Sequence, residues 1–247
     1  MHVLDLLHPR AVTNGRFARV GSQFDGGYVM VEQARTDSVA YSFGIGGNID
    51  WDRHMADAGH TVFQYDHTVR DPAPDDSRMV FFPFGIDGHR SMDGRMRTLE
   101  DLLRSNGHQT YDDLILKMDV EGSEWPVFST IGEGTLAQFT QIVVELHGLA
   151  KLGSKRDWRK VEPALRAMTL NHVPVHLHGN NCSRTVEVNG RPFPNVLEVT
   201  LLRKDQAVFV DRDCSFPTEL DAPNDPNLPE IILGRFVPTT NVATKTL

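Results

Sequence analysis

The chain has 247 residues, of which 40% are hydrophobic and 23% are charged, an ordinary balance for one large globular domain. A formal net charge of -8 argues against a general electrostatic grip on nucleic acid, and no stretch is long and apolar enough to span a bilayer. Neither nucleic acid nor a membrane is therefore expected as a partner. Two cysteines make no disulfide framework and the start lacks a secretory signal, which favours a cytoplasmic location.

The middle of the chain alternates short apolar runs with amphipathic stretches. This alternation is typical of βα units, and it predicts an α/β fold with a mostly parallel, Rossmann-like sheet over residues 38–205. Residues 1–37 precede the first sheet strand and are predicted to form a cap segment over the ligand-binding edge. The expected strands cover residues 39–43, 61–65, 79–84, 114–118, 142–146, 173–177 and 195–203, and the expected helices cover residues 50–58, 98–105, 124–131 and 158–169.

The end of the domain differs from the βα pattern. Residues 179–194, GNNCSRTVEVNGRPFP, have no helical apolar stripe and are rich in Gly, Asn and Pro, so a loop is expected there. A parallel neighbour would need a crossover, usually a helix, and the last strand is therefore predicted to be antiparallel. Residues 206–247 are Pro- and Asn-rich in part and are predicted to form an irregular tail.

A glycine cluster, Gly44, Gly46 and Gly47, follows the first expected strand and precedes a helix. Glycines allow a tight turn and a close approach of a ligand, and the next helix offers free N–H groups to a phosphate or carboxylate. Asp66 follows the second strand, where an acid can accept hydrogen bonds from ribose hydroxyls. The alternative is a tight βα turn without a ligand. Ile49 stands where a dinucleotide fingerprint has its third glycine, which disfavours NAD or FAD.

Two further turns are candidate parts of the same cofactor site. Asp25 lies in the run FDGGY of the cap segment and is expected to reach the cofactor. Ile86 follows the third strand and is expected to line an adenine pocket. For each of them a plain turn or loop is the alternative.

Three expected strand ends carry pairs of acids and histidines two positions apart. Side chains at this spacing share a face of an extended strand, and charges inside a sheet protein are costly unless they are paired or bind a metal. The carboxyl ends of parallel strands are also where open α/β sheets bind ligands. The pairs are Asp119 with Glu121, Glu145 with His147, and His176 with His178.

These residues allow two kinds of chemistry. His147, with Asp119 and Glu121, is predicted to be catalytic, and His147 is preferred as the general base because its ordinary pKa is near neutrality. Alternatively, Asp119, Glu145 and His178 hold one divalent ion, Mg, Mn, Fe or Zn, that acidifies the acceptor hydroxyl. The structural alternatives are an ion pair between an acid and Lys117 or an arginine, an ordinary core role for His176, and a simple helix start at Glu124.

The motifs together resemble the FkbM-like branch of class I methyltransferases. The run LKMDVEGSEW at 116–125 resembles its LKIDVEG-type motif, and DGGYV at 25–29, SFGIGG at 42–47 and HGNN at 178–181 match further signatures. The resemblance implies methyl transfer from S-adenosylmethionine to a hydroxyl of a sugar or another small molecule. It also implies that Gly44, Gly46, Gly47, Asp66 and Asp119 contact the cofactor, with Asp119 beside the transferring methyl group.

Three rival functions remain open at the level of the sequence. A nicotinamide-dependent oxidoreductase would share the glycine turn, but not the reversed last strand. A non-catalytic protein that binds S-adenosylmethionine or sugar would leave the strand-end acids and histidines without a use. A metal-dependent hydrolase could use the same acids, but it would not need the glycine turn.

Overall fold

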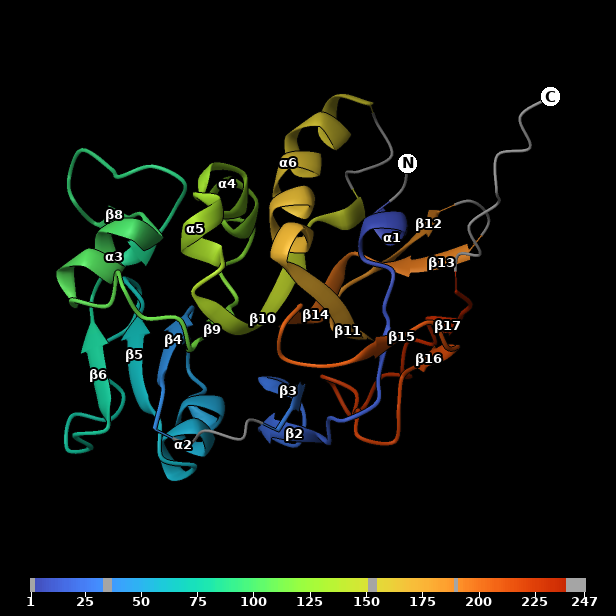
Figure 1. Cartoon of the computed structure of the whole chain (residues 1–247), viewed down its shortest axis with the longest axis horizontal. Helices are drawn as coiled ribbons and strands as arrows, with labels where there is room; N and C mark the ends of the chain where they lie inside the picture. Colours follow the sequence, from blue (N-terminus) through green and yellow to red (C-terminus); the bar gives the residue numbers. More distant parts are fainter. Residues whose placement is uncertain (1–2, 33–36, 151–154, 189–190, 239–247) are drawn as a thin grey trace.

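The computed structural model describes residues 3–32, 37–150, 155–188 and 191–238. Its centre is one large sheet of seven strands, which Figure 1 shows running across the molecule. In chain order these strands are β4 (Val39–Phe43), β5 (Thr61–Tyr65), β6 (Met79–Phe82), β9 (Leu114–Met118), β10 (Phe139–His147), β11 (His172–Gly179) and β14 (Val196–Arg203).

The strand order in this sheet is β11-β14-β10-β9-β4-β5-β6. The neighbouring pairs β10-β9, β9-β4, β4-β5 and β5-β6 are parallel, whereas β14 runs antiparallel to both β10 and β11. The predicted α/β fold, with a mostly parallel sheet and an antiparallel last strand, is therefore confirmed. The sequence did not indicate that β14 would lie between β10 and β11.

Helices cover the sheet on both faces, because the strands alternate their side chains between two apolar layers. On β4, Tyr41 and Phe43 join the larger core, whereas Ala40 joins a smaller one with Trp51 and Met55 of a helix on the opposite face. Figure 1 shows this helix, α2, on one side of the sheet and α4 and α6 on the other. The helices are α1 (Val3–Leu6), α2 (Asp50–Asp57), α3 (Leu99–Ser105), α4 (Glu124–Thr130), α5 (Glu133–Leu136) and α6 (Lys155–Asn171).

Two polar side chains tie the N-terminal cap segment to the central sheet. The segment holds a hairpin of β2 (Phe17–Gly21) and β3 (Gly27–Val31). The amide of Gln141 in β10 pairs with the backbone N–H and carbonyl of Val31 at 2.8 and 3.0 Å, and the Thr200 hydroxyl of β14 donates to the Val29 carbonyl at 2.6 Å. The strand β3 is therefore held across the α2 face of the sheet.

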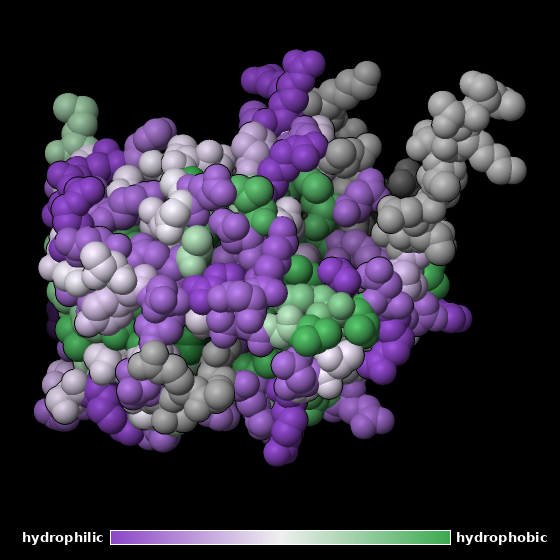
Figure 2. All heavy atoms as spheres, viewed as in Figure 1, coloured by the Kyte–Doolittle hydropathy of each residue, from purple (hydrophilic) through white to green (hydrophobic). Residues whose placement is uncertain are grey.

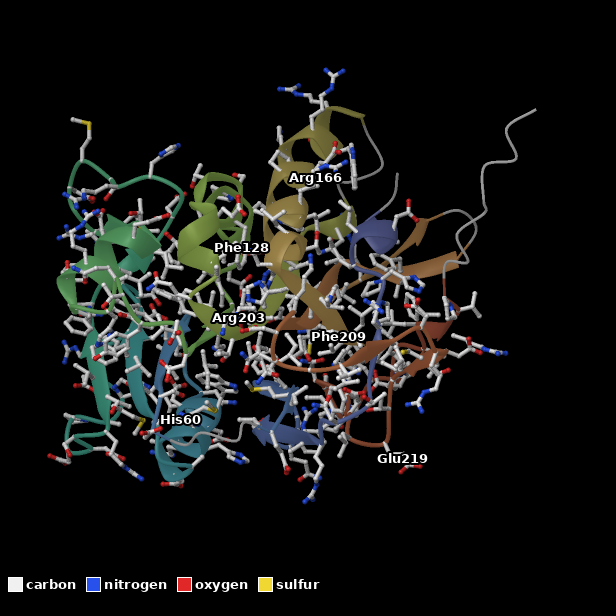
Figure 3. All side chains as sticks on the ribbon, in the orientation of Figure 1. His60, Phe128, Arg166, Arg203, Phe209 and Glu219 are labelled. Carbon is white, nitrogen blue, oxygen red and sulfur yellow. The ribbon has the colours of Figure 1, made fainter. Side chains whose placement is uncertain are left out.

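Arg203 at the end of β14 fixes the reversed strand to its neighbours. Its guanidinium donates to the carbonyls of Asp112 and Ala137 at 2.6 and 2.7 Å, just before β9 and β10 begin. Figure 3 shows Arg203 near the middle of the molecule and Phe128 of α4 above it. Because Phe128 is fully buried, α4 is anchored to the same core as the sheet.

The loop expected at residues 179–194 is in part a hairpin, so that prediction is wrong for its second half. The strands β12 (Thr185–Val188) and β13 (Arg191–Pro194) pair antiparallel there. The dipeptide Asn-Gly at 189–190 is a sequence signal for a hairpin, and the prediction gave it less weight than the general Gly, Asn and Pro content.

Short strands also occur outside the large sheet. In the described part of the expected tail, short strands pair with one another or with the N-terminal part of the chain, and the chain between these strands is irregular. The remaining strands are β1 (Ala11–Val12), β7 (Gly85–Ile86), β8 (Met96–Arg97), β15 (Phe209–Val210), β16 (Cys214–Phe216) and β17 (Gly234–Phe236).

The face of the molecule in Figure 2 is mostly polar, and hydrophobic residues show in several separate areas between the polar ones. Within the described part of the chain, no helix combines the length and the hydropathy that a bilayer crossing needs.

Candidate active site

The turn after β4 is shaped by glycines that serve two different purposes. At Gly44, φ is +76° and an added Cβ would lie 1.5 Å from the carbonyl oxygen of Asp119, so only glycine lets β4 turn beside the end of β9. At Gly46 and Gly47, an added Cβ would meet no atom within 4 Å. These two glycines therefore leave open space along the backbone, as a ligand-binding turn requires.

Asp66, at the end of β5, holds this turn in place. The N–H groups of Ile45 and Gly46 donate to Asp66 Oδ2 at 2.9 and 3.0 Å, and Thr68 donates to Oδ1 through its N–H and hydroxyl at 2.7 and 2.6 Å. Burial alone would raise the pKa of Asp66, but these hydrogen bonds outweigh it and hold the pKa below its usual range. Asp66 is therefore an ionised support of the glycine turn, a role the sequence did not indicate.

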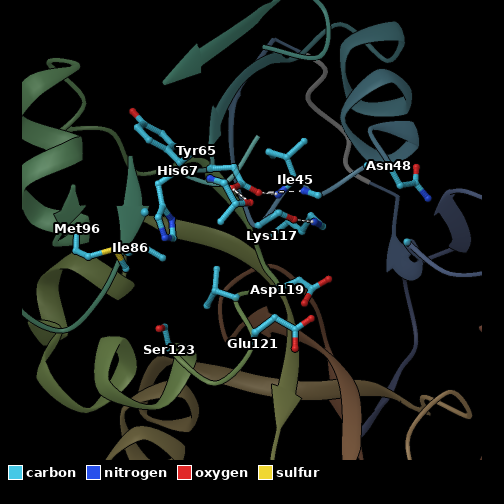
Figure 4. A pocket seen from close by; sticks show the side chains of 18 of the residues that line it. Ile45, Asn48, Tyr65, His67, Ile86, Met96, Lys117, Asp119, Glu121 and Ser123 are labelled. Carbon is cyan, nitrogen blue, oxygen red and sulfur yellow. Dashed lines mark hydrogen bonds between the residues drawn. The ribbon is translucent and has the colours of Figure 1, made fainter. Parts of the chain in front are cut away.

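A cavity of about 440 Å³ lies beside the turn, at the carboxyl ends of β4, β5 and β9. Figure 4 shows Lys117, Asp119 and Glu121 on one side of it and Ile86 and Met96 on another. Among the residues that line it are all those predicted to bind the cofactor, namely Asp25, Gly44, Gly46, Gly47, Asp66, Ile86 and Asp119. Lining residues that the sequence did not indicate are Tyr65, His67, Thr68, Met96 and Ser123.

Lys117 of β9 connects the sheet to the glycine turn. Its buried ammonium donates to the carbonyl of Gly44 at 2.9 Å, and it offsets the negative charge of the buried Asp52 of α2. Burial raises the pKa of Asp52, and the nearby Lys117 opposes that rise. The lysine therefore supports the glycine turn from below.

Asp119, Glu145 and His147 form a compact group at the ends of β9 and β10. One ligand atom from each lies within 4.8 Å of those of the other two. Tyr28 donates its hydroxyl to Asp119 Oδ2 at 3.4 Å, and Asn180 donates its amide to Glu145 Oε1 at 2.5 Å. Burial, and next the negative charges of neighbouring acids, raise the pKa of Glu145 well above its usual value. The same surroundings would favour a cation beside Glu145.

Asp119 and Glu121 both approach His147, but not for the predicted reason. The strand β9 ends at Met118, and Glu121 has φ of +55°, so the segment does not stay extended as expected. His147 Nε2 nevertheless lies 3.8 Å from Asp119 Oδ1 and 3.4 Å from Glu121 Oε2. The turn, rather than a shared strand face, brings the three predicted catalytic residues together.

Glu124 is a site residue that the sequence interpretation treated as a simple helix start. Its carboxylate is fully buried, accepts the backbone N–H of His147 at 2.6 Å and lies 3.2 Å from His147 Nδ1. Its other oxygen accepts the N–H of Gly122 at 2.8 Å. The signal that could have revealed it is its place three residues after Glu121 in DVEGSE, where an acid directly follows the strand-end turn.

The contact with Glu124 sets the orientation and the acidity of His147. With Nδ1 toward Glu124, Nε2 faces Asp119 and Glu121. Burial would lower the pKa of His147, but the hydrogen bond and charge of Glu124, followed by the two other acids, raise it overall. This arrangement suits an imidazole that accepts a proton at Nε2.

His178 lies apart from this group. Its Nδ1 is 3.0 Å from Glu198 and its Nε2 is 3.3 Å from Glu230, and these acids outweigh the effect of burial and raise its pKa to about 9. Of the predicted metal ligands, the structure brings Asp119 and Glu145 together, and it places His147 rather than His178 beside them. His176 is likewise paired, with its Nε2 3.0 Å from Asp221 Oδ2.

Comparison of the sequence with known proteins gives a match to one family model. The methyltransferase FkbM domain matches residues 28–174, which is more than half of the chain. No curated protein matches the sequence.

Among solved structures, a predicted O-methyltransferase from Agrobacterium tumefaciens shares 11% identity at a TM-score of 0.37, with 71% of this chain and 77% of that chain covered. A fibrillarin/Nop5p complex shares 10% identity at a TM-score of 0.42, with 76% and 93% covered. A Methanococcus jannaschii fibrillarin shares 8% identity at a TM-score of 0.40, with 79% and 87% covered.

Proposed function

Because the chain belongs to the FkbM methyltransferase family, we propose that it transfers a methyl group from S-adenosylmethionine to a hydroxyl of a sugar or another small molecule. The acceptor is a small molecule rather than nucleic acid, in keeping with the net charge of -8. A cytoplasmic location belongs to the same proposal and rests on the sequence and on two cysteines that are both free.

The observation that carries the proposal is the position of His147 beside the cavity of the glycine turn. Asp119 lines that cavity, and the imidazole lies 3.8 Å behind it. The cavity also suits the cofactor, since its wall combines open glycines, carboxylates and apolar side chains. The backbone at Gly46 and Gly47 would receive the methionine part of the cofactor. Asp25 or Asp66 would accept hydrogen bonds from the ribose hydroxyls or from the amino group of the methionine part. Ile86 and Met96 would pack on the adenine ring.

The residues of the chain would supply alignment and proton transfer. S-adenosylmethionine, when bound, supplies an electrophilic methyl group, so the acceptor oxygen needs to lose a proton and to be held in place. His147 Nε2 takes this proton, and Glu124 at Nδ1 stabilises the imidazolium that results. Asp119 and Glu121 add negative charge around the same nitrogen.

A divalent ion is the second route to the same deprotonation. Asp119, Glu145 and His147 offer two carboxylates and one imidazole, a set that suits Mg, Mn, Fe or Zn. The raised pKa of the buried Glu145 supports this route, because a cation would balance two neighbouring acids. In this version the ion held by these residues would lower the pKa of the acceptor hydroxyl.

Ligand binding separates this proposal from a nicotinamide-dependent oxidoreductase. S-adenosylhomocysteine should raise the melting temperature of the protein and bind in calorimetry, whereas NAD should do neither, since only a ligand of the folded state stabilises it. Stabilisation by NAD but not by S-adenosylhomocysteine would refute the proposal.

His147→Ala tests the catalytic part. This variant should lose turnover while its affinity for S-adenosylhomocysteine stays within about a few-fold of wild type. Full turnover in the variant would exclude His147 as the base. Metal analysis after chelation, followed by recovery of turnover with Mg, Mn, Fe or Zn, decides between the two routes.

A further inference from the structure

We call the cavity beside the glycine turn the cofactor cavity, after its proposed ligand. A second cavity, of about 710 Å³, adjoins it at Glu121, which lines both. We call it the α4–α6 cavity, because α4 and the first turns of α6 form two of its walls and the end of β10 forms a third. The polar and aromatic side chains that line it include Glu121, Trp125, His147, Asp157, Lys160 and Asn195.

His147 lies on the boundary between the two cavities. It lines the α4–α6 cavity and not the cofactor cavity, whereas Asp119 lines only the cofactor cavity. Their side chains are 3.8 Å apart, and Glu121 bridges the two spaces at 3.4 Å from His147 Nε2. A molecule in the α4–α6 cavity would thus present a hydroxyl to the imidazole at the edge of the cofactor site.

The wall beside His147 is fixed in position. The indole N–H of Trp125 donates to the carbonyl of His147 at 2.7 Å, and the amide oxygen of Asn195 accepts the backbone N–H of Ala150 at 3.0 Å. Both side chains are therefore held in place before any ligand binds, which lowers the entropic cost of binding.

The lining indicates the class of ligand. Carboxylates at Glu121 and Asp157 and the amide of Asn195 suit hydroxyl groups, while Trp125 and Val161 offer apolar surface to a ring. The ammonium of Lys160 lies 3.4 Å from Asp157, so these two charges offset each other, and Glu121 leaves the lining with one net negative charge when His147 is neutral. An anionic ligand would meet repulsion there.

We propose that the α4–α6 cavity is the acceptor site and that it takes an uncharged ring compound with several hydroxyl groups, not a phosphorylated or carboxylated one. This inference rests on the proposed methyl transfer, and it adds to it the place and the charge class of the acceptor.

The test fills the cavity from either wall and measures binding rather than turnover. Ser129 on α4 and Lys160 on α6 line the α4–α6 cavity but not the cofactor cavity, so Ser129→Trp and Lys160→Trp narrow only the former. Ser105→Trp, at the exposed end of α3, is the matched control. Each protein is saturated with S-adenosylhomocysteine and examined by saturation-transfer NMR with methyl glycosides of glucose, galactose and mannose, and with glucose 6-phosphate.

The wild type and Ser105→Trp should bind at least one methyl glycoside. They should bind glucose 6-phosphate more weakly than this glycoside by about tenfold or more. Both cavity-filling variants should lose glycoside binding and keep their calorimetric affinity for S-adenosylhomocysteine. Glycoside binding that survives in both cavity-filling variants would overturn the proposed location of the acceptor site. Glucose 6-phosphate that binds the wild type as tightly as a glycoside or more tightly would overturn the proposed uncharged class of acceptor, and so would the absence of glycoside binding to the wild type. Failure of S-adenosylhomocysteine to bind the wild type would instead refute the proposed function.

Discussion

At the scale of single residues, the site depends on a buried carboxylate that makes no contact with the cofactor cavity. Glu124 accepts hydrogen bonds from the backbone of both His147 and Gly122, and it also faces the imidazole. It therefore fixes the end of β10, the turn after β9 and the direction of the proposed base at once. A carboxylate buried to this degree is costly unless such partners are present, so its burial depends on the backbone N–H groups and the imidazole of the site.

Glu124→Gln should move the pH dependence of turnover. The imidazole must be neutral to accept a proton, so the rate rises with pH through the pKa of His147, and the negative charge of Glu124 raises that pKa. Removing this charge should shift the acid limb of the kcat profile to lower pH by about one unit. Glu133→Gln, on the exposed start of α5, is the control and should leave the profile unchanged. An unshifted limb in Glu124→Gln would show that Glu124 does not act on the base.

Gly44 and Gly47 should respond differently to the same change. Gly44→Ala places a Cβ against the Asp119 carbonyl at a left-handed φ, so the free energy of unfolding should fall by about 3 kcal/mol or more. Gly47→Ala meets open space and should leave stability within about 0.5 kcal/mol. It should nevertheless weaken the binding of S-adenosylhomocysteine by about tenfold, since Gly47 lines the cofactor cavity. Denaturation and calorimetry on both variants check this contrast, and equal loss of stability in the two would contradict it.

At the scale of elements, the HGNN motif at the end of β11 connects the sheet to the C-terminal segment, residues 206–238. Asn180 donates to Glu145, whereas Asn181 donates to the carbonyls of Asp225 and Leu228 at 3.0 and 3.1 Å. His178 contributes its contact with Glu230 in the same segment. One strand end therefore supports the candidate metal group on one side and holds the C-terminal segment on the other.

The pKa of His178 predicts a stability change at alkaline pH. Its folded-state value of about 9 lies above the ordinary 6.5, so its contribution is complete below pH 6.5 and is lost as the pH rises through 9. The groups that face it are Glu198, Glu230 and Asp221. The difference in unfolding free energy between wild type and His178→Gln should therefore shrink by up to about 3 kcal/mol from pH 6 to pH 10. A difference that is constant over this range in denaturation experiments would rule out a charged His178.

At the scale of the whole molecule, three distant parts of the chain meet beside the cofactor cavity. Asn224 of the C-terminal segment donates to Glu198 of β14 at 2.7 Å and to Asp25 of the cap segment at 3.1 Å. Asp25 itself lines the cofactor cavity. The two segments outside the central sheet are thus joined to each other and to the sheet by one buried amide.

Asn224→Ala should therefore affect both stability and cofactor binding. Loss of the hydrogen bonds to the buried Glu198 and the exposed Asp25 should lower the free energy of unfolding by about 1–3 kcal/mol and weaken S-adenosylhomocysteine binding a few-fold through Asp25. Asn227→Ala is the control, because Asn227 is exposed and its side-chain amide donates to the nearby Asp225. Thermal denaturation and calorimetry measure the two effects, and a variant as stable and as tight-binding as Asn227→Ala would mean that the bridge is unimportant.

The sequence predicted that the glycine turn and Asp66 lie together at one edge of the sheet, and it predicted less of the acid and histidine group. Gly44–Gly47 and Asp66 follow consecutive parallel strands, and the order of the chain alone brings such strand ends to one edge. Glu124 was missed because an acid at the start of a helix is common there for electrostatic reasons. His178 was grouped with Asp119 and Glu145, since a strand pattern gives the face of a side chain but not its distance from a neighbour.

The order of apolar runs and turns by itself determined the α/β architecture, the reversed last strand and the glycine turn, because these follow from local periodicity and short connections. Only the tertiary structure decided that β14 lies between β10 and β11, that Glu124 orients His147, and that His178 turns to Glu198 and Glu230. Such contacts join residues that are distant in sequence, and they depend on the strand order and side-chain packing that the folded chain alone defines.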